Sequence, residues 1–122
     1  MSVRRTEMLA NGDYLRMELR LLTDIGWFSE MECHSNNGSI KENIAKCINY
    51  DKDRMLNYLK SCKKIASCPK NAIDCLTGET ISPSFSVYDD GEFCWGDFLL
   101  YHIEKYNIKL PQALINKANA NL

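Results

Sequence analysis

The chain has 122 residues, 45% of them hydrophobic, and its 15 basic and 16 acidic side chains give a formal net charge of −1. This length predicts one domain, residues 1–122, with enough apolar residues to bury a core without disulfides. No apolar run approaches the ~18 residues of a membrane span, and the N-terminus lacks a signal peptide's apolar stretch. We therefore expect a protein that stays in the cytoplasm and makes no membrane contact.

Three segments in the first half of the chain have the spacing of amphipathic helices. Leucines recur at i, i+4 and i+7 in the first segment, which places them on one helix face. Ser39 and Glu42 form a capping box at the start of the second, because each side chain satisfies a backbone N–H at a helix N-terminus. Asp51 is the predicted N-cap of the third. We therefore expect helices over residues 13–25, 39–50 and 51–62.

The composition changes after residue 64, where proline, glycine, serine and threonine separate short alternating segments. Apolar residues alternate on both sides of Asp90-Gly91, and this dipeptide is a strong signal for a two-residue hairpin turn. The pattern predicts an antiparallel hairpin over about residues 84–95. A third strand, around residues 65–67 or 72–74, is expected to pair with it.

The last part of the chain returns to helical spacing. Asp97 is expected to cap a helix over residues 97–107, and a final short helix carries Leu114 and Ile115. The sequence thus predicts an α+β fold, in which a helical body packs against a small antiparallel sheet. The β content should be confined to about residues 64–96, with helices before and after.

The six cysteines are widely spaced, and no two of them have the C-x-x-C spacing of a zinc or redox site. Two of them, Cys47 and Cys62, fall at apolar positions of the predicted helices. In a cytoplasmic protein we expect all six to be reduced and partly buried. Neither a metal ion nor another cofactor is expected. A thiol or metal protein that uses Cys62, Cys68 and Cys75 remains one alternative.

No motif in the sequence indicates catalysis. The two histidines lie far apart, and a glycine-rich phosphate loop and a nucleophile elbow are both missing. A cysteine nucleophile needs a nearby base, and Cys94 with His102 is one pair that the chain offers. Six cysteines and two histidines give many such pairs by chance, however. We therefore predict that the protein is not an enzyme and has no catalytic residues.

The charge of the chain is unevenly distributed. Residues 71–104 contain no Lys or Arg but seven acidic side chains, whereas four lysines lie just upstream between residues 60 and 70. Such a stretch is either a solvated face or a source of negative potential that repels nucleic acid and steers a basic protein partner. Direct nucleic-acid binding is therefore not expected. The acids are Asp74, Glu79, Asp89, Asp90, Glu92, Asp97 and Glu104.

The acidic stretch lies inside a longer pattern. Its parts are a helix ending in Tyr58-Leu59-Lys60-Ser61, Asp74 followed by Thr77-Gly78-Glu79, Asp90-Gly91 followed by Trp95, and the run from Tyr101 to Pro111. Over about residues 57–115 the chain resembles bacterial immunity proteins of polymorphic-toxin and contact-dependent growth inhibition systems. It departs from their pattern at Cys62, where glycine is commoner, and at His102, where a second tyrosine is.

The resemblance implies a function without catalysis. Such immunity proteins act in the cytoplasm by binding a cognate toxin domain, often a nuclease, and blocking its active site or substrate groove. A nuclease must attract phosphate and tends to be basic, so an acidic surface would speed its capture. The alternative that keeps the same surface is a small non-catalytic regulatory or adaptor domain that binds another protein.

The candidate contact residues follow from the resemblance and the charge together. The tip of the hairpin, with Asp89, Asp90 and Glu92, is expected to be the most exposed part of the acidic stretch, and Glu79 is expected on a neighbouring loop. Trp95 is expected to pack in the core under the hairpin rather than in an interface. The predicted partner-binding residues are Glu79, Asp89, Asp90, Glu92, Asp97 and Tyr101.

Overall fold

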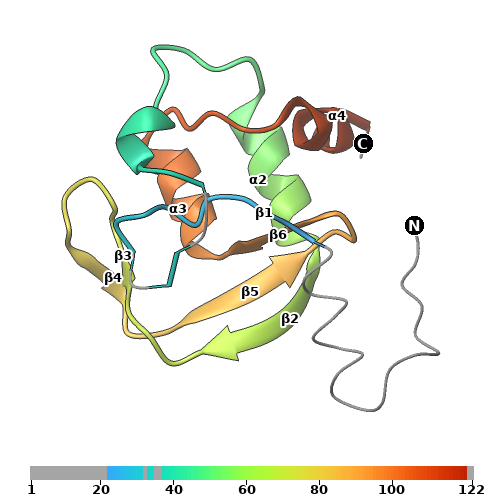
Figure 1. The fold of residues 1–122 in the computed structure, drawn as a ribbon. Coiled ribbons are helices and arrows are strands. Elements are labelled where there is room, and N and C mark those ends of the chain that lie inside the picture. The colour runs from blue at the N-terminus through green and yellow to red at the C-terminus, as the bar shows by residue number, and fades with distance from the viewer. Residues whose placement is uncertain (1–21, 32, 35–36, 121–122) are drawn as a thin grey trace.

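The structure, a computed structural model, describes residues 22–31, 33–34 and 37–120. In that part of the chain the strands form one four-stranded and one two-stranded sheet, accompanied by three α-helices and a 3-10 turn (Figure 1). The elements are β1 (Thr23–Asp24), η2 (Ile40–Glu42), α2 (Lys52–Lys60), β2 (Lys63–Cys68), β3 (Ala72–Ile73), β4 (Thr80–Ser82), β5 (Phe85–Asp89), β6 (Phe93–Gly96), α3 (Phe98–Lys105) and α4 (Gln112–Ala120).

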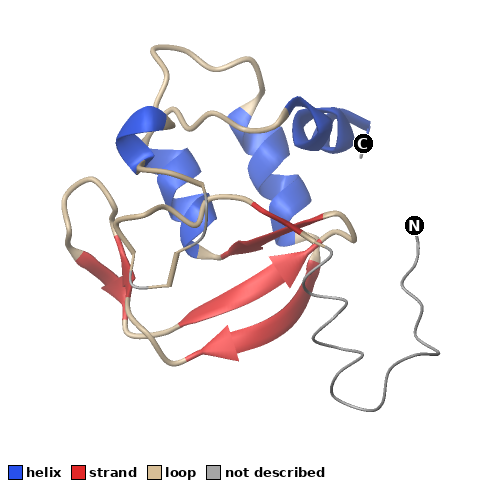
Figure 2. Ribbon diagram, in the orientation of Figure 1, coloured by secondary structure: helices blue, strands red, loops and turns tan. Residues whose placement is uncertain are grey.

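The larger sheet has the strand order β1-β6-β5-β2. β2 and β6 each pair antiparallel with β5, whereas β1 pairs parallel with β6. β3 and β4 form a separate antiparallel pair. The helices lie together on one side of the larger sheet in Figure 2, so helices and strands are segregated rather than alternating along the fold. The chain is therefore a mixed domain of helices and strands.

The sequence predicted more helix before β2 than the described residues contain. Among the described residues before β2, the only α-helix is α2, where three helices were predicted. Its start is as expected, because the Asp51 side chain accepts a hydrogen bond from the Arg54 backbone N–H at 3.0 Å. No helix in the described part of the chain is long and apolar enough to cross a membrane.

The helix predicted over residues 39–50 is present only as the 3-10 turn η2. The capping box forms between Ser39 and Glu42, but the chain then leaves the helical path. Ala45 donates its backbone N–H to the Asn107 carbonyl at 2.9 Å, in an antiparallel bridge between residues 44 and 108. Backbone groups that a helix would pair locally are thus paired with a distant segment. Cys47, which the predicted helix would have buried, is exposed.

The helix predicted over residues 13–25 falls mostly outside the described residues, and its described end is a strand. Thr23 donates its backbone N–H to the Glu92 carbonyl at 2.8 Å, and Ile25 donates to the Cys94 carbonyl at 3.0 Å. This strand, β1, corrects two predictions, since β structure is not confined to residues 64–96 and the sheet is not wholly antiparallel.

The predicted hairpin is confirmed as β5 and β6, with β2 as its third strand. Of the two segments proposed for that strand, residues 65–67 lie in β2, whereas Ala72 and Ile73 of β3 pair with β4 instead. The turn differs in detail from the prediction. Asp90 donates its backbone N–H to the Phe93 carbonyl at 3.2 Å, so the turn centres on the two residues between them.

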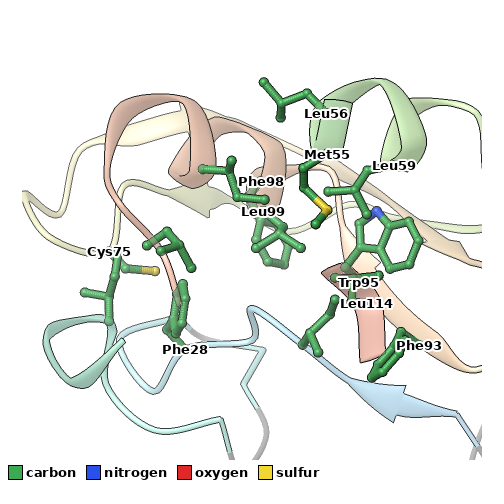
Figure 3. Packing of buried hydrophobic residues seen from close by; sticks show 14 of the residues in the cluster. Phe28, Met55, Leu56, Leu59, Cys75, Phe93, Trp95, Phe98, Leu99 and Leu114 are labelled. Carbon is green, nitrogen blue, oxygen red and sulfur yellow. The ribbon is translucent and has the colours of Figure 1, made fainter. Parts of the chain in front are cut away.

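The core lies between the helices and the larger sheet. Trp95 is 0% exposed, which confirms its predicted packing under the hairpin. Figure 3 shows Met55 and Leu59 of α2 pointing toward the Trp95 indole, and both are members of the same buried cluster. Leu114 and Ile115 of α4 are buried as predicted. Burial of these side chains is the main favourable contribution to folding.

Candidate functional site

The six predicted contact residues divide into two groups at opposite ends of the β5–β6 hairpin. Asp89, Asp90 and Glu92 belong to the connection between β5 and β6, which we call the hairpin turn (residues 89–93). Glu79 belongs to the connection between β3 and β4, which we call the Asp74 turn (residues 74–79). Figure 1 places the β3–β4 pair at the left and the hairpin turn at the right. The expectation that Glu79 neighbours the hairpin tip is therefore wrong.

The other two predicted residues lie on the side of the Asp74 turn or near the base of the hairpin. Tyr101 on α3 is half-buried, and its hydroxyl donates to Asp74 Oδ2 at 2.8 Å. Asp97 is exposed and precedes α3, but its carboxylate makes no capping bond. It accepts the Ser86 backbone N–H at 3.2 Å instead, at the start of β5. The predicted cap is therefore wrong, because the neighbouring strand supplies the donor.

Asp90 in the hairpin turn is a buried structural residue, although the sequence predicted an exposed one. Its side chain is only 3% exposed. Oδ1 accepts the backbone N–H groups of Glu92 and Phe93 at 2.9 and 2.8 Å. Oδ2 accepts the Tyr58 hydroxyl at 2.7 Å and the Lys117 ammonium at 3.4 Å. Burial raises the pKa of Asp90, but these donors together hold the pKa below its ordinary value.

Lys117 brings a positive charge into the acidic stretch from α4. Its Nζ lies 2.8 Å from Glu92 Oε1 and 5.5 Å from the centroid of the Phe93 ring. Burial lowers the pKa of this lysine, but Glu92 and Asp90 outweigh that effect and raise it overall. Across the strands, Asp89 stands opposite Lys63. The hairpin turn is consequently less negative than its own sequence suggests.

The Asp74 turn is built around a second buried carboxylate, which is 0% exposed. Lys105 Nζ lies 3.5 Å from its Oδ2. Burial raises the pKa of Asp74, but the hydrogen bonds it accepts hold the pKa well below its usual range. The donors, at 2.8 to 3.0 Å, are the Tyr101 and Tyr106 hydroxyls and the backbone N–H groups of Leu76 and Thr77.

This bonding leaves a fixed turn on the surface. Asp74 and Glu79 are joined by a backbone hydrogen bond of 2.8 Å, and Gly78 donates to the Asp74 carbonyl at 2.7 Å. Gly78 has a φ of 83°, the left-handed conformation that glycine adopts most easily. Glu79 is exposed, and so is Leu76, at 41% of its surface. Leu76 is the one exposed large hydrophobic residue among those described.

A histidine and a cysteine meet behind the Asp74 turn, joined by a hydrogen bond from the cysteine backbone. The Cys75 backbone N–H donates to His102 Nε2 at 3.0 Å, so the neutral ring carries its proton on Nδ1. Burial lowers the pKa of His102 to about 4. Burial also raises the pKa of the Cys75 thiol to about 12, which keeps it protonated. A thiol in that state is a poor nucleophile.

Cys94 is a second buried thiol. The Cys94 thiol donates to Asp24 Oδ1 at 2.9 Å, rather than to His102, and burial raises its pKa to about 12. All six cysteines are free thiols. In the part of the chain that the structure describes, no three His, Cys, Asp or Glu side chains come together in a way that would hold a metal ion.

Two hollows lie near these groups. One, of about 370 Å³, is lined by Tyr58, Asp90, Lys117 and Ala120, so it belongs to the hairpin turn. The other, of about 170 Å³, lies between the β1 region and the segment before α4. None of the predicted contact residues lines the second hollow, whose lining residues include Asp24, Asn37, Asn43 and Lys109.

Side chains from separate sequence motifs form hydrogen bonds with one another. Tyr58 binds Asp90, and Tyr101 and Tyr106 bind Asp74. Sequence reasoning missed these pairs, and also missed Lys105, Lys117 and Leu76. An aspartate whose side chain accepts backbone N–H groups two and three residues further on is a local feature of such a turn. Its distant tyrosine and lysine partners leave no local signal. No family model, curated protein or solved structure matches the chain.

Proposed function

We propose that this protein is an immunity protein, which binds a cognate basic toxin domain in the cytoplasm and occludes its active site or substrate groove. The toxin domain that we expect is a nuclease, because nucleases carry the positive charge that an acidic surface would complement. The proposal requires neither a catalytic residue nor a cofactor in this chain.

The observation that carries the proposal is the structural role of the residues that define the resemblance. Tyr58 and Asp90 bond to each other, as do Asp74 and Tyr101, and Trp95 fills the core. Residues that hold one another in place specify a fold, so a shared pattern of them supports a shared architecture. Contacts with a partner would then fall to the exposed residues between them.

The exposed acids supply negative charge suited to a basic partner, at both ends of the β5–β6 hairpin. Glu79, Glu92 and Asp97 are exposed, and Asp89 is partly so. Complementary charge raises the association rate most, since it steers the two proteins before they touch. The backbone that carries these side chains is held in strands and tight turns, so it loses little conformational entropy when a partner binds.

The test uses the toxin domain encoded by the gene directly upstream. Co-expression with the wild-type protein should rescue bacterial growth, and the two purified proteins should form a stoichiometric complex that lacks the toxin's activity. A Glu79→Gln, Asp89→Asn, Glu92→Gln variant should associate more slowly and show a weaker dependence on salt. Asp90 is left intact, because it is buried.

A control variant, Asp53→Asn, removes an exposed acid from the first turn of α2, outside the acidic stretch. It should associate at close to the wild-type rate. Failure of the wild-type protein to bind the upstream toxin domain, together with failure to protect cells, would contradict the proposal and favour an adaptor role.

A further inference from the structure

We propose that the Asp74 turn is an acid-sensitive switch, which opens when a proton binds Nε2 of His102 while the rest of the domain stays folded. The inference goes beyond the proposed function, because the switch needs no partner. It assigns a role to the one buried histidine among the described residues.

Most hydrogen bonds of the Asp74 turn join residues of the turn to one another. Gly78 donates its backbone N–H to the Asp74 carbonyl at 2.7 Å, and Asp74 donates its own to the Glu79 carbonyl at 2.8 Å. The Asp74 carboxylate accepts two further backbone N–H groups from within the turn. The turn can therefore move as a unit without losing the bonds that give it its shape.

The hydrogen bonds that fasten this turn to the rest of the described chain lead to α3 and to Tyr106, which follows that helix. The Tyr101 and Tyr106 hydroxyls both donate to Asp74 Oδ2 at 2.8 Å. The backbone N–H of Cys75 donates to His102 Nε2 at 3.0 Å. One carboxylate and one imidazole thus accept all the hydrogen bonds between the turn and these helical residues, and a proton on either acceptor would weaken the attachment.

The Cys75 bond occupies the basic nitrogen of the His102 ring. A neutral imidazole has one nitrogen that can accept a proton, and in His102 that nitrogen is the one bonded to the Cys75 N–H. The His102 side chain is 0% exposed, and Cys75 is 5% exposed. A proton from solvent therefore reaches Nε2 only when the Cys75 backbone moves away. Once protonated, Nε2 is itself a donor and cannot take the Cys75 N–H back, so protonation and opening are one event.

The part that moves is the turn, because the imidazole is held in place by its neighbours. Phe28 packs edge-on against the ring, with 5.6 Å between centroids, and Tyr106 stacks on it at 6.3 Å. Leu99 and Ile103, on the same helix as His102, are both 0% exposed. A shift of α3 would open the core, whereas a shift of the turn exposes little more than Cys75.

His102 is the group that changes charge between pH 6.5 and 4. Burial lowers its pKa to about 4, so the closed turn is fully favoured above pH 6.5 and loses stability as the pH falls toward 4. Burial raises the pKa values of Asp74 and Glu30, but the hydrogen bonds that they accept hold both below their ordinary values. Burial raises the pKa of Cys75 and of Tyr106 to about 12. The charged and titratable groups near the ring are Glu30, Asp74, Cys75, Tyr101, Lys105 and Tyr106.

The test measures the rate at which dithiodipyridine modifies Cys75 in the folded protein, with each cysteine followed by mass spectrometry. Cys75 is buried in the closed turn and becomes accessible when the turn opens. The exposed Cys47 in the same sample corrects for the reagent's own pH dependence. The ratio of the Cys75 rate to the Cys47 rate should rise by about tenfold per pH unit between about pH 6 and 4.5. In His102→Gln the ratio should not depend on pH, because the amide oxygen accepts the Cys75 N–H without titrating.

Cys94 distinguishes opening of the turn from unfolding of the whole domain. This cysteine is 7% exposed and lies on β6, next to the hairpin turn. In the wild-type protein Cys75 should react at least ~10-fold faster than Cys94 at each pH, since local opening needs less free energy than global unfolding. This comparison needs no variant, so it decides the proposal even if His102→Gln does not fold. Equal rates for Cys75 and Cys94 would overturn the local switch, and a Cys75 ratio that does not change with pH would overturn the role of His102.

Discussion

The two acidic turns of this protein are built on the same plan. Each centres on a buried aspartate that accepts two backbone N–H groups on one oxygen, and a tyrosine hydroxyl and a lysine ammonium on the other. Each also contains a glycine in the left-handed conformation, Gly78 at φ 83° and Gly91 at φ 93°. The chain therefore uses one arrangement twice to fix a turn against helices.

The turns differ in what they are tied to and what they expose. Asp90 ties the hairpin turn to α2 through Tyr58 and to α4 through Lys117. Asp74 ties its turn to α3 through Tyr101 and Lys105, and also to Tyr106, which follows that helix. One turn exposes Glu92, which is paired with Lys117, and the other exposes Leu76 and Glu79, which has no ion pair with any described residue. An acidic residue in sequence is thus not a measure of free negative charge at the surface.

The largest expected effect is the loss of the Asp74 carboxylate. Asp74→Ala leaves two tyrosine hydroxyls, two backbone N–H groups and Lys105 without their acceptor, so the free energy of unfolding should fall by about 3–5 kcal/mol. Urea unfolding followed by circular dichroism measures this loss. Asp74→Asn is the control, and it should cost less because one side-chain oxygen still accepts. A loss below about 1 kcal/mol for the alanine variant would show that the carboxylate is dispensable.

The second largest expected effect is a loss of stability at low pH, caused by His102 behind the Asp74 turn. The folded state lowers the pKa of His102 to about 4 from 6.5, so the unfolded chain binds a proton more tightly. Stability is therefore full above pH 6.5 and falls as the pH drops toward 4, by about 3 kcal/mol in all. Asp74 does not offset this loss, because its own lowered pKa keeps it ionised over that range.

The measurement is the free energy of unfolding at several values between pH 7.5 and 4.5. His102→Gln should remove most of the slope, since an amide oxygen can still accept the Cys75 N–H without titrating. An unchanged slope in the His102 variant would assign the acid sensitivity to other groups.

Removal of the Asp90 carboxylate should cost less, about 2–3 kcal/mol, because it leaves one tyrosine hydroxyl unpaired instead of two. The comparison of the turns also predicts where the damage spreads. In Asp90→Ala, Lys117 loses a partner, so backbone amides of α4 should exchange with solvent faster while those of α3 stay protected. Asp74→Ala should show the opposite pattern. Equal protection of α4 in both variants would mean that Lys117 does not hold the helix.

The smallest effect concerns the turn glycines. Gly78→Ala and Gly91→Ala should each cost about 1 kcal/mol, because alanine is strained at positive φ. At both positions a Cβ would meet nothing within 4 Å, so the two costs should agree. Gly26→Ala should lose more, since its Cβ would approach Leu99 Cδ1 to 2.7 Å. Thermal unfolding resolves these differences, and unequal values for the two turn glycines would show that the turns are less alike than their bonds indicate.

Local signals in the sequence predicted local structure well. Asp51 caps α2 and Ser39 with Glu42 forms a capping box, because each bond joins residues three apart. The hairpin followed from apolar alternation around a glycine turn. The failures came where a distant segment competes for backbone bonds. Residues 43–45 bond to residues 107–109, and residues 23–25 bond to the chain around β6, so neither of these stretches is helical.

The sequence alone determined the caps at Ser39 and Asp51, the β5–β6 hairpin, the burial of Trp95 and the presence of an acidic stretch, since each depends on neighbours in the chain or on average polarity. Only the tertiary structure decided which acids remain available to a partner. The Tyr58 and Lys117 partners of Asp90 lie 32 and 27 residues away, and the Tyr106 and Tyr101 partners of Asp74 lie 32 and 27 residues away. Contacts at that separation exist only once the helices have packed on the sheet, because no local pattern brings the two ends together.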